Sequence, residues 1–298
     1  MRVLITGGAG FIGSHLAEYL RSLDIEVFIF DKSDHHLCSD FPMENFTFIE
    51  GDVQDKLSVD RAVENCDVIF HLAGVLGTDF LVGFPELAVK INTLGTINVL
   101  NAARNSGATL LYLSLLPEWN NPYMITKHAG ERFCNMYYNE FGVPTIVARA
   151  THIYGPRQKW HPVKKAVPTF IMNALRGEPL KVYGTGEQLM DLLYVVDAAK
   201  ALWECVESRK TIGQTLELGS GKGISVISLA KMIIELCKSD SKIEYEEMRP
   251  GEPNTPDSFA PANIDLLNSL LGFEPKVDLQ MGLEQTIDWY RRLVQKKC

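Results

Sequence analysis

The sequence predicts an α/β fold in which helices cover both faces of a parallel sheet. Short apolar runs rich in β-branched residues alternate with amphipathic segments throughout the first half of the chain. A glycine-rich turn joins the first apolar run to the first helical pattern. The chain has 298 residues, 46% of them hydrophobic and 22% charged, which suits one large globular domain or two lobes.

The glycine turn predicts a dinucleotide site. Residues 3–5 form an apolar strand, T-G-G-A-G-F-I-G fills 6–13, and apolar residues at helical spacing follow. Such a turn places bare N–H groups and the positive end of a helix beside a pyrophosphate, whereas the alternative is a purely structural turn. We therefore expect cofactor contacts from Gly7, Gly10, Phe11, Ile12 and Gly13.

The next two strands predict the adenosine end of that site. Residues 26–30 form a strand that ends at Asp31, about 20 residues after the glycine turn, where a carboxylate can bind both ribose hydroxyls. The carboxylate would repel a 2′-phosphate and so favours NAD over NADP, although Lys32 weakens this preference and Asp31 could instead cap a loop. A third strand, 46–50, is followed by Asp52 and Val53, the expected edge of the adenine pocket.

Further alternation completes the sheet. A helix over 56–63 precedes a strand over 67–70, after which Leu72, Ala73 and Gly74 allow close approach to a cofactor, while His71 is interpreted as structural. A long helix over 86–105 carries Asn92. It is followed by a strand over 109–114, a helix over 122–138 and a strand over 145–150.

The second half is less regular and predicts a smaller α/β lobe over the carboxyl edge of the sheet. Helices are expected over 163–176, 195–207, 225–238 and 279–296, and strands near 181–183 and 215–218. We divide the chain into a cofactor domain, 1–155 with 191–218 returning to it, and a substrate lobe, 156–190 with 219–298.

A tyrosine and a lysine predict the proton-transfer site. Asn121 is a good N-cap and Pro122 suits the first helical position, so Tyr123 and Lys127 lie one turn apart on the same face. The ammonium and the helix end should lower the pKa of the Tyr123 phenol from about 10. Tyr123 could then accept a proton while hydride leaves the same carbon for NAD. A coincidental pair on a solvated helix is the alternative.

Composition excludes several other classes. A net charge of −8 argues against nucleic-acid and anionic-membrane partners, and no targeting segment or membrane-spanning run is recognisable. Six scattered cysteines without C-x-x-C spacing indicate reduced thiols in a cytoplasm. His35, His36 and Cys38 could suggest a metal, but a polar loop is preferred and no metal is expected.

Taken together, these motifs resemble the extended short-chain dehydrogenase/reductase family, in its nucleotide-sugar epimerase/dehydratase branch. The resemblance implies a Rossmann-type doubly wound sheet, bound NAD, a nucleotide-sugar substrate and a homodimer formed through the helices over 86–105 and 122–138. It covers nearly the whole chain and rests on T-G-G-A-G-F-I-G, Asp31, Asp52-Val53, H-L-A-G at 71–74, Asn92 with Gly95-Thr96, Tyr123-x-x-x-Lys127, Y-G-P-R-Q at 154–158, V-Y-G-T-G-E-Q at 182–188, R-P-G at 249–251, L-G-F-E-P at 271–275, and Gly282-Leu283 to Trp289-Tyr290.

Three departures from the family pattern concern the substrate end. Leu115 stands where the family has a substrate-facing Ser or Thr, so Ser114 shifts into that role, Thr126 or a water replaces it, or the activity is weak. Met190 replaces an arginine that meets the diphosphate, which leaves Arg249 as the expected partner or as a surface arginine. His152 replaces an asparagine and either contacts the substrate or packs.

The leading functional prediction is an NAD-dependent 4-epimerase of a UDP-sugar, with transient oxidation at C4, rotation of the keto-sugar and return of the hydride. The expected catalytic residues are Tyr123, Lys127 and Ser114, and His152 and Arg249 are the expected substrate ligands. In dehydratases of the family an acid pair occupies the positions that residues 115–117 fill here, and these residues are not acidic. In related decarboxylases a glutamate has this role, and Glu118 is a few residues out of register for it. A keto-sugar reductase and a non-enzymatic NAD-binding protein stay open as alternatives.

Overall fold

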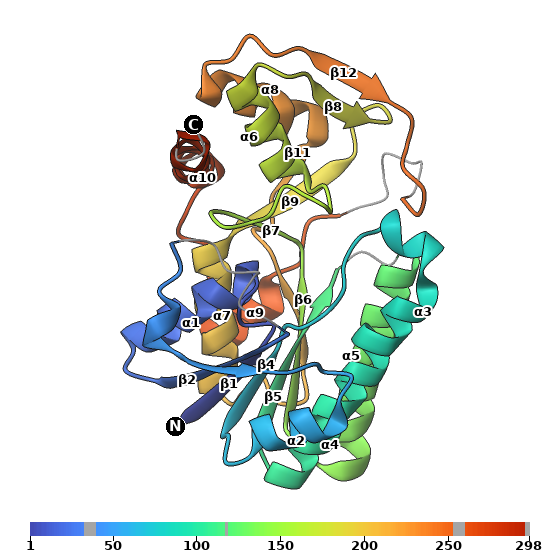
Figure 1. The fold of residues 1–298 in the computed structure, drawn as a ribbon, viewed down its shortest axis with the longest axis vertical. Coiled ribbons are helices and arrows are strands. Elements are labelled where there is room, and N and C mark those ends of the chain that lie inside the picture. The colour runs from blue at the N-terminus through green and yellow to red at the C-terminus, as the bar shows by residue number, and fades with distance from the viewer. Residues whose placement is uncertain (33–39, 117–118, 253–259, 296–298) are drawn as a thin grey trace.

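The computed structural model describes residues 1–32, 40–116, 119–252 and 260–295 and contains the predicted parallel sheet (Figure 1). Within these residues, seven strands lie in the order β3-β2-β1-β4-β5-β6-β10, and every neighbouring pair is parallel. They are β1 (Arg2–Thr6), β2 (Glu26–Asp31), β3 (Thr47–Glu50), β4 (Val68–His71), β5 (Thr109–Leu115), β6 (Thr145–Ala150) and β10 (Thr215–Leu218). The order reverses between β1 and β4, where the carboxyl ends of strands form a ligand-binding crevice in such sheets.

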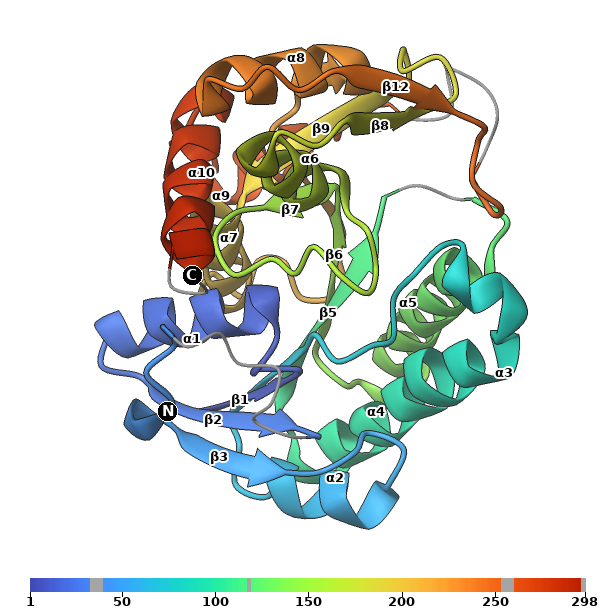
Figure 2. The ribbon, with the colours of Figure 1, turned by 45° about the horizontal axis from the view of Figure 1, so that its top comes forward.

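Helices cover both faces of the sheet, as Figures 1 and 2 show. One face carries α1 (Phe11–Ser22), α7 (Val195–Glu207) and α9 (Asp265–Leu271), and the other carries α2 (Lys56–Val63), α4 (Gly95–Ser106) and α5 (Pro122–Phe141). Along β1, Val3 and Ile5 enter the core under α1 and α7, whereas Leu4 enters the core under α4 and α5. This alternation is what a strand buried on both faces requires.

A third hydrophobic core lies in the second half of the chain and gathers at one end of the sheet (Figure 2). The chain enters this part directly from β6, since β7 begins two residues later. Its elements are β7 (His152–Tyr154), α6 (Ala166–Arg176), β8 (Leu180–Tyr183), β9 (Leu189–Tyr194), β11 (Gly223–Ser225), α8 (Val226–Cys237), β12 (Ile243–Glu246) and α10 (Leu279–Gln295). Strand β9 pairs with β7 and β11, and β8 pairs with β12.

The helix expected over 86–105 is divided into three segments. These are α3 (Pro85–Ala88), the π-helix η4 (Val89–Leu94) and α4. Asn92 is buried within η4, and a Cβ atom on Gly95 would lie 2.7 Å from Cγ2 of Val53, so α4 begins where the helix packs closely on that residue. Sequence reasoning did not predict strands β7, β9, β11 and β12, helix α9 or the 3-10 helices η2 (Met43–Asn45) and η3 (Phe80–Gly83).

None of the described helices has the length and apolar character needed to cross a membrane. Within the described ranges, no three His, Cys, Asp or Glu side chains come together as ligands for a metal ion. His35, His36 and Cys38 lie outside those ranges.

Candidate active site

The glycine turn has the geometry of a pyrophosphate cradle. Gly7 has a φ of +71°, and its N–H donates to the Phe30 carbonyl at 2.8 Å, so the turn is fixed to β2. A Cβ on Gly13 would lie 2.5 Å from the Gly7 carbonyl oxygen, a contact that no side chain can make. Gly10 is the N-cap of α1 and provides no side-chain cap, so the first N–H groups of the helix are available to an anion. The turn therefore fits the phosphates of a dinucleotide.

Asp31 lies directly beside this turn, at the end of β2. Its Oδ2 accepts a hydrogen bond from the Ala9 N–H at 3.1 Å, and its Oδ1 accepts one from the Lys32 N–H at 2.8 Å. The Lys32 ammonium forms an ion pair with Asp52 at 2.9 Å. Burial would raise the pKa of Asp52, but bonds from Gln54 and Lys32 outweigh it and lower the pKa. The charge of Lys32 is thus already compensated by Asp52, and the Asp31 carboxylate beside the turn is the charge that would meet a 2′-phosphate.

The loop after β4 completes the cofactor edge. A Cβ on Gly7 would lie 2.8 Å from the Ala73 nitrogen, so this loop and the glycine turn are in close contact. Asn92 holds the loop from the other side: its Oδ1 accepts from the Val75 N–H at 2.8 Å and its Nδ2 donates to the Val75 carbonyl at 3.0 Å. The loop that carries Leu72, Ala73 and Gly74 is therefore fixed on both sides.

His71 is buried beneath this loop and serves the scaffold. Its Nδ1 lies 2.7 Å from Thr6 Oγ1 and its Nε2 lies 3.0 Å from Thr96 Oγ1. Burial and the nearby charge of Lys127 lower the pKa of His71 to about 3, so the ring is neutral at physiological pH.

Tyr123 and Lys127 lie on the first turns of α5, which begins as expected. Asn121 accepts the Met124 N–H at 3.0 Å as N-cap, and Pro122 occupies the first helical position. The side-chain amide of Asn92 also donates to Thr126 Oγ1 at 3.1 Å, which ties this first turn to the cofactor loop. The Thr126 hydroxyl donates back to the Pro122 carbonyl at 2.6 Å and is committed within the helix.

The sequence predicts a lowered pKa for the Tyr123 phenol, and for the chain alone this prediction is wrong. Burial raises the pKa of Tyr123 to about 12, and burial also lowers the pKa of Lys127 to about 7. The Lys127 ammonium lies 4.2 Å from the centre of the Tyr112 ring. Sequence spacing indicates that Tyr123 and Lys127 share a face of the helix. It does not reveal the loss of hydration, which dominates both pKa values.

Ser114 and Leu115 mark the end of β5. Ser114 is fully buried, and its hydroxyl donates to Glu131 Oε2 at 3.0 Å. The same Oε2 atom of Glu131 accepts a hydrogen bond from Arg149 Nε at 2.9 Å and lies 3.4 Å from His128 Nδ1. Burial would raise the pKa of Glu131, yet the bonds from His128, Arg149 and Ser114 and the charge of Arg149 lower it to about 2. The Ser114 hydroxyl is thus part of a buried charged network that fastens α5 to β5 and β6, and Glu118 lies outside the described residues.

Arg249 and its neighbours lie beside the loop after β4 and the start of α5. The Arg249 guanidinium bonds Glu252 Oε1 at 2.5 Å and lies 4.8 Å from the centre of the Tyr183 ring. Glu252 Oε1 also accepts the Thr78 hydroxyl at 3.1 Å, and Asn121 Nδ2 donates to the Gly251 carbonyl at 2.9 Å. The R-P-G-E segment therefore contacts both the loop after β4 and the first turn of α5.

Two further positions show where the sequence departs from the expected pattern. His152 begins β7, and burial, with the nearby charge of Lys165, lowers its pKa to about 4, so it is uncharged near neutral pH. Met190 is buried in the third core, where an apolar side chain packs well. Sequence reasoning missed Lys165, Thr78 and Glu252 as site residues; the helix expected over 163–176 included Lys165, whereas α6 begins at Ala166 and leaves Lys165 as its N-cap.

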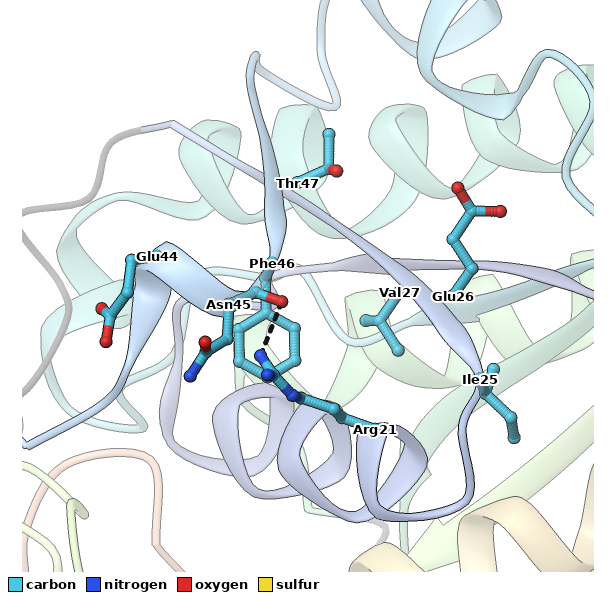
Figure 3. Close-up of a pocket in the computed structure, with 8 residues that line it drawn as sticks. All are labelled: Arg21, Ile25, Glu26, Val27, Glu44, Asn45, Phe46 and Thr47. Carbon is cyan, nitrogen blue, oxygen red and sulfur yellow. Dashed lines mark hydrogen bonds between the residues drawn. The ribbon is translucent and has the colours of Figure 1, made fainter.

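A cavity of about 280 Å³ lies away from these residues, at the amino end of β2 (Figure 3). The last turn of α1, η2 and the start of β3 enclose it, and Arg21 Nη1 donates across it to the Asn45 carbonyl at 2.9 Å. The glycine turn follows the carboxyl end of β1, so this cavity lies at the opposite edge of the sheet.

Comparison with known proteins agrees with this geometry. Residues 3–219 match the model of the NAD dependent epimerase/dehydratase family. A UDP-N-acetyl-alpha-D-glucosaminuronate decarboxylase from Bacillus cytotoxicus is 32% identical, over 98% of both chains. UDP-glucose 4-epimerase from Thermotoga maritima, solved with UDP-glucose, has a TM-score of 0.90 at 27% identity, over 99% of this chain and 100% of that one.

A third comparison includes the cofactor itself. UDP-glucuronic acid 4-epimerase from Bacillus cereus, solved with UDP-glucuronic acid and NAD, has a TM-score of 0.87 at 26% identity, over 98% of this chain and 100% of that one. The glycine cradle, Asp31 and the fixed loop after β4 fit such a cofactor. The chain therefore belongs to the NAD-dependent epimerase/dehydratase family, the nucleotide-sugar branch of the extended short-chain dehydrogenases/reductases, with a Rossmann-type sheet and NAD as cofactor.

Proposed function

We propose that this chain is a nucleotide-sugar 4-epimerase that acts on a UDP-sugar. The observation that carries the proposal is the position of Tyr123 and Lys127 on the first turns of α5, joined to the cofactor loop through Thr126 and Asn92. Bound NAD supplies a reversible hydride acceptor at the sugar carbon. In this proposal the glycine turn holds the pyrophosphate, Asp31 holds the adenosine ribose, and Lys127 binds the nicotinamide ribose.

Tyr123 is the proposed base for the C4 hydroxyl. Because burial alone keeps its pKa near 12, the phenolate must be stabilised by a cation, and Lys127 with a pKa near 7 supplies one only in its protonated form. Tyr123 takes the hydroxyl proton as the carbon is oxidised and returns it when the carbon is reduced on its other face. Ser114 is proposed to position α5 through Glu131, since its hydroxyl is buried in that bond.

Epimerisation is favoured over elimination of water by the end of β5. Leu115 and Leu116 bring no acid or base to this edge, whereas elimination needs a second acid–base pair. Epimerisation needs only the tyrosine, the cofactor and room for the sugar to turn. Decarboxylation is the second candidate, because a relative 32% identical over nearly the whole chain is named for that reaction.

The test is product analysis by NMR. Purified protein with NAD is incubated with UDP-, dTDP- and GDP-sugars, and inversion at C4 is distinguished from loss of water or of carbon dioxide. We expect Tyr123→Phe to lower turnover by at least about 100-fold with NAD binding unchanged. Tyr138→Phe, an exposed tyrosine on the same helix, should match the wild type. No conversion by the wild type, or equal conversion by Tyr123→Phe, would contradict the proposal.

We also propose that two copies associate through the face that carries α4 and α5. Exposed apolar side chains gather there, with Val89 and Leu94 on η4 and Ile125 on α5 each 45% exposed or more. An apolar patch on helices suits a two-fold interface. Ile125→Arg should give a monomer in light scattering, whereas Leu57→Arg, at a 63% exposed leucine on α2, should leave a dimer.

A further inference from the structure

Lys165 is a cation that faces the proposed base. It is the last residue before α6, and its side chain does not cap that helix. Its Nζ lies 5.8 Å from the centre of the Tyr123 ring. Among the residues that the structure describes, its ammonium makes no hydrogen bond or ion pair. A partly buried ammonium in this state has lost hydration, and no described side chain replaces it with a hydrogen bond.

The two carboxylates whose charges raise the pKa of Lys165 are bound to other groups. Glu252 accepts bonds from Arg249 and Thr78, and Asp79 accepts the N–H of Phe80 at 2.8 Å as the N-cap of η3. Burial and the charge of Arg249 lower the pKa of Lys165, while Glu252 and Asp79 raise it in part. His152, also close by, is neutral near pH 7 and contributes no charge. Neither of these two carboxylates is therefore paired with the Lys165 ammonium.

The two ends of Lys165 point to different parts of a substrate. With Arg249 as the proposed partner of the diphosphate, the backbone of Lys165 lies at the diphosphate end, because Arg249 Nη1 approaches the Lys164 carbonyl at 3.4 Å and the uncapped start of α6 is beside it. Its ammonium lies at the other end, against Tyr123. An anion that meets this ammonium therefore belongs to the sugar rather than to the diphosphate.

We propose that the sugar of the substrate carries a carboxylate and that Lys165 binds it beside Tyr123. This inference rests on the proposed function and names its substrate class, a nucleoside diphosphate linked to a uronic acid. An ammonium is a compact point charge with three donors, which suits a carboxylate at the end of a pocket. A sugar with only hydroxyl groups leaves the charge of Lys165 uncompensated.

The experiment measures binding by calorimetry to the NAD-loaded protein, with UDP, UDP-glucose and UDP-glucuronate as probes. The wild type should bind UDP-glucuronate about 10-fold more tightly than UDP-glucose, the effect of one charge-assisted hydrogen bond. Lys165→Met should remove this preference and leave the affinities for UDP and UDP-glucose within twofold. Lys165→Arg should restore part of it. Lys164→Met is the matched control, since it removes the same charge from the adjacent, exposed residue and should preserve the preference.

Three outcomes would overturn the proposal. One is equal binding of both sugars by the wild type, and another is an equal loss of affinity for all three probes in Lys165→Met, which would place Lys165 on the diphosphate. The third is failure of all three probes to bind, which also contradicts the uridine nucleotide of the proposed function. If the preference holds but no C4 inversion is detected, the epimerase assignment fails and the carboxylate site stands.

Discussion

The two ends of the candidate active site are built in different ways. The cofactor end depends on close contacts between backbone segments. A side chain on Gly7 would clash with the backbone of Ala73, and one on Gly13 would clash with the backbone of Gly7. The substrate end depends on charged side chains that bind one another, in the pairs Arg249–Glu252 and Glu131–Arg149. Only a few residue types satisfy the first arrangement, whereas many combinations satisfy the second.

This difference separates the binding of cofactor from the choice of substrate. A backbone cradle is complete before the ligand arrives, so its contribution to affinity needs no rearrangement. In the proposed function, Arg249 would exchange Glu252 for a phosphate when the substrate binds. We therefore expect substitutions at the cofactor end to cause large losses, and those at the substrate end to cause graded changes.

The largest effect is expected from Gly13→Ala. The new methyl group would lie 2.5 Å from the Gly7 carbonyl oxygen and 2.6 Å from the Gly8 Cα, and neither backbone atom can yield cheaply. Affinity for NAD should fall by about 100-fold or more, measured by calorimetry. Gly107→Ala is the control, since its Cβ would meet no atom within 4 Å despite a φ of +76°. It should cost about 1 kcal/mol of unfolding free energy and leave NAD affinity unchanged. Equal NAD affinity in both variants would refute the cradle.

The next effect is expected from Glu131→Gln, which removes the charge of the carboxylate that binds Arg149. Breaking a buried pair costs several kcal/mol, and the partial exposure of Arg149 reduces this to about 2–3 kcal/mol of unfolding free energy. Ser114→Ala should cost only about 1 kcal/mol and lower the turnover rate less than about threefold, because its hydroxyl serves Glu131. Urea unfolding and steady-state kinetics measure both.

A matched control for Glu131→Gln is Asp60→Asn, which breaks the more exposed Lys56–Asp60 pair on α2. It should change stability by less than about 1 kcal/mol. If Ser114→Ala instead lowers the turnover rate about 100-fold, the scale of a lost proton-transfer group, Ser114 is a catalytic residue and its role as a positioning residue is contradicted.

Mild acid should destabilise both ends through buried histidines. The pKa values of His71 and His152 are lowered to about 3 and about 4, mainly by burial, from an ordinary value of 6.5. The unfolded chain therefore takes up protons first as the pH falls below 6.5, and stability is lost from there down to the folded pKa values. Each histidine contributes a slope of about 1.4 kcal/mol per pH unit at most. Unfolding free energies at pH 7, 6 and 5 should show a smaller slope in His71→Gln, and an unchanged slope would contradict the neutral, buried ring.

The cofactor end could be predicted from the sequence because its signals are local. The glycine turn, the strand that ends at Asp31 and the N-cap at Asn121 each lie within a short segment whose residues restrict the backbone directly. The alternation of strands and helices then placed these segments at one edge of a parallel sheet, as the structure confirms.

The substrate end could not be predicted in the same way. Thr78 and Glu252 are 174 positions apart in sequence, and Asn121 and Gly251 are 130 apart. No periodicity brings such pairs together. The direction of the Tyr123 pKa was also missed, because burial, which depends on the whole fold, outweighs the lysine that sequence spacing reveals. The π-helix around Asn92 was not predicted, because its six residues have the same apolar pattern as an α-helix.

The smallest effect, and the one that links both ends, is expected at Asn121. Its Oδ1 caps α5 and its Nδ2 binds the Gly251 carbonyl of the R-P-G-E segment, so Asn121 connects the helix that carries Tyr123 to the segment that carries Arg249. Asn121→Ser keeps a capping oxygen but loses the bond to Gly251. We expect its KM for the nucleotide sugar to rise about fivefold, the value of one hydrogen bond, with turnover and stability nearly unchanged. Asn121→Ala should show the same rise in KM and lose a further ~1 kcal/mol of unfolding free energy with the cap. If Asn121→Ser matches the wild type in KM while Asn121→Ala does not, the cap alone matters, and the contact with Gly251 contributes nothing to substrate binding.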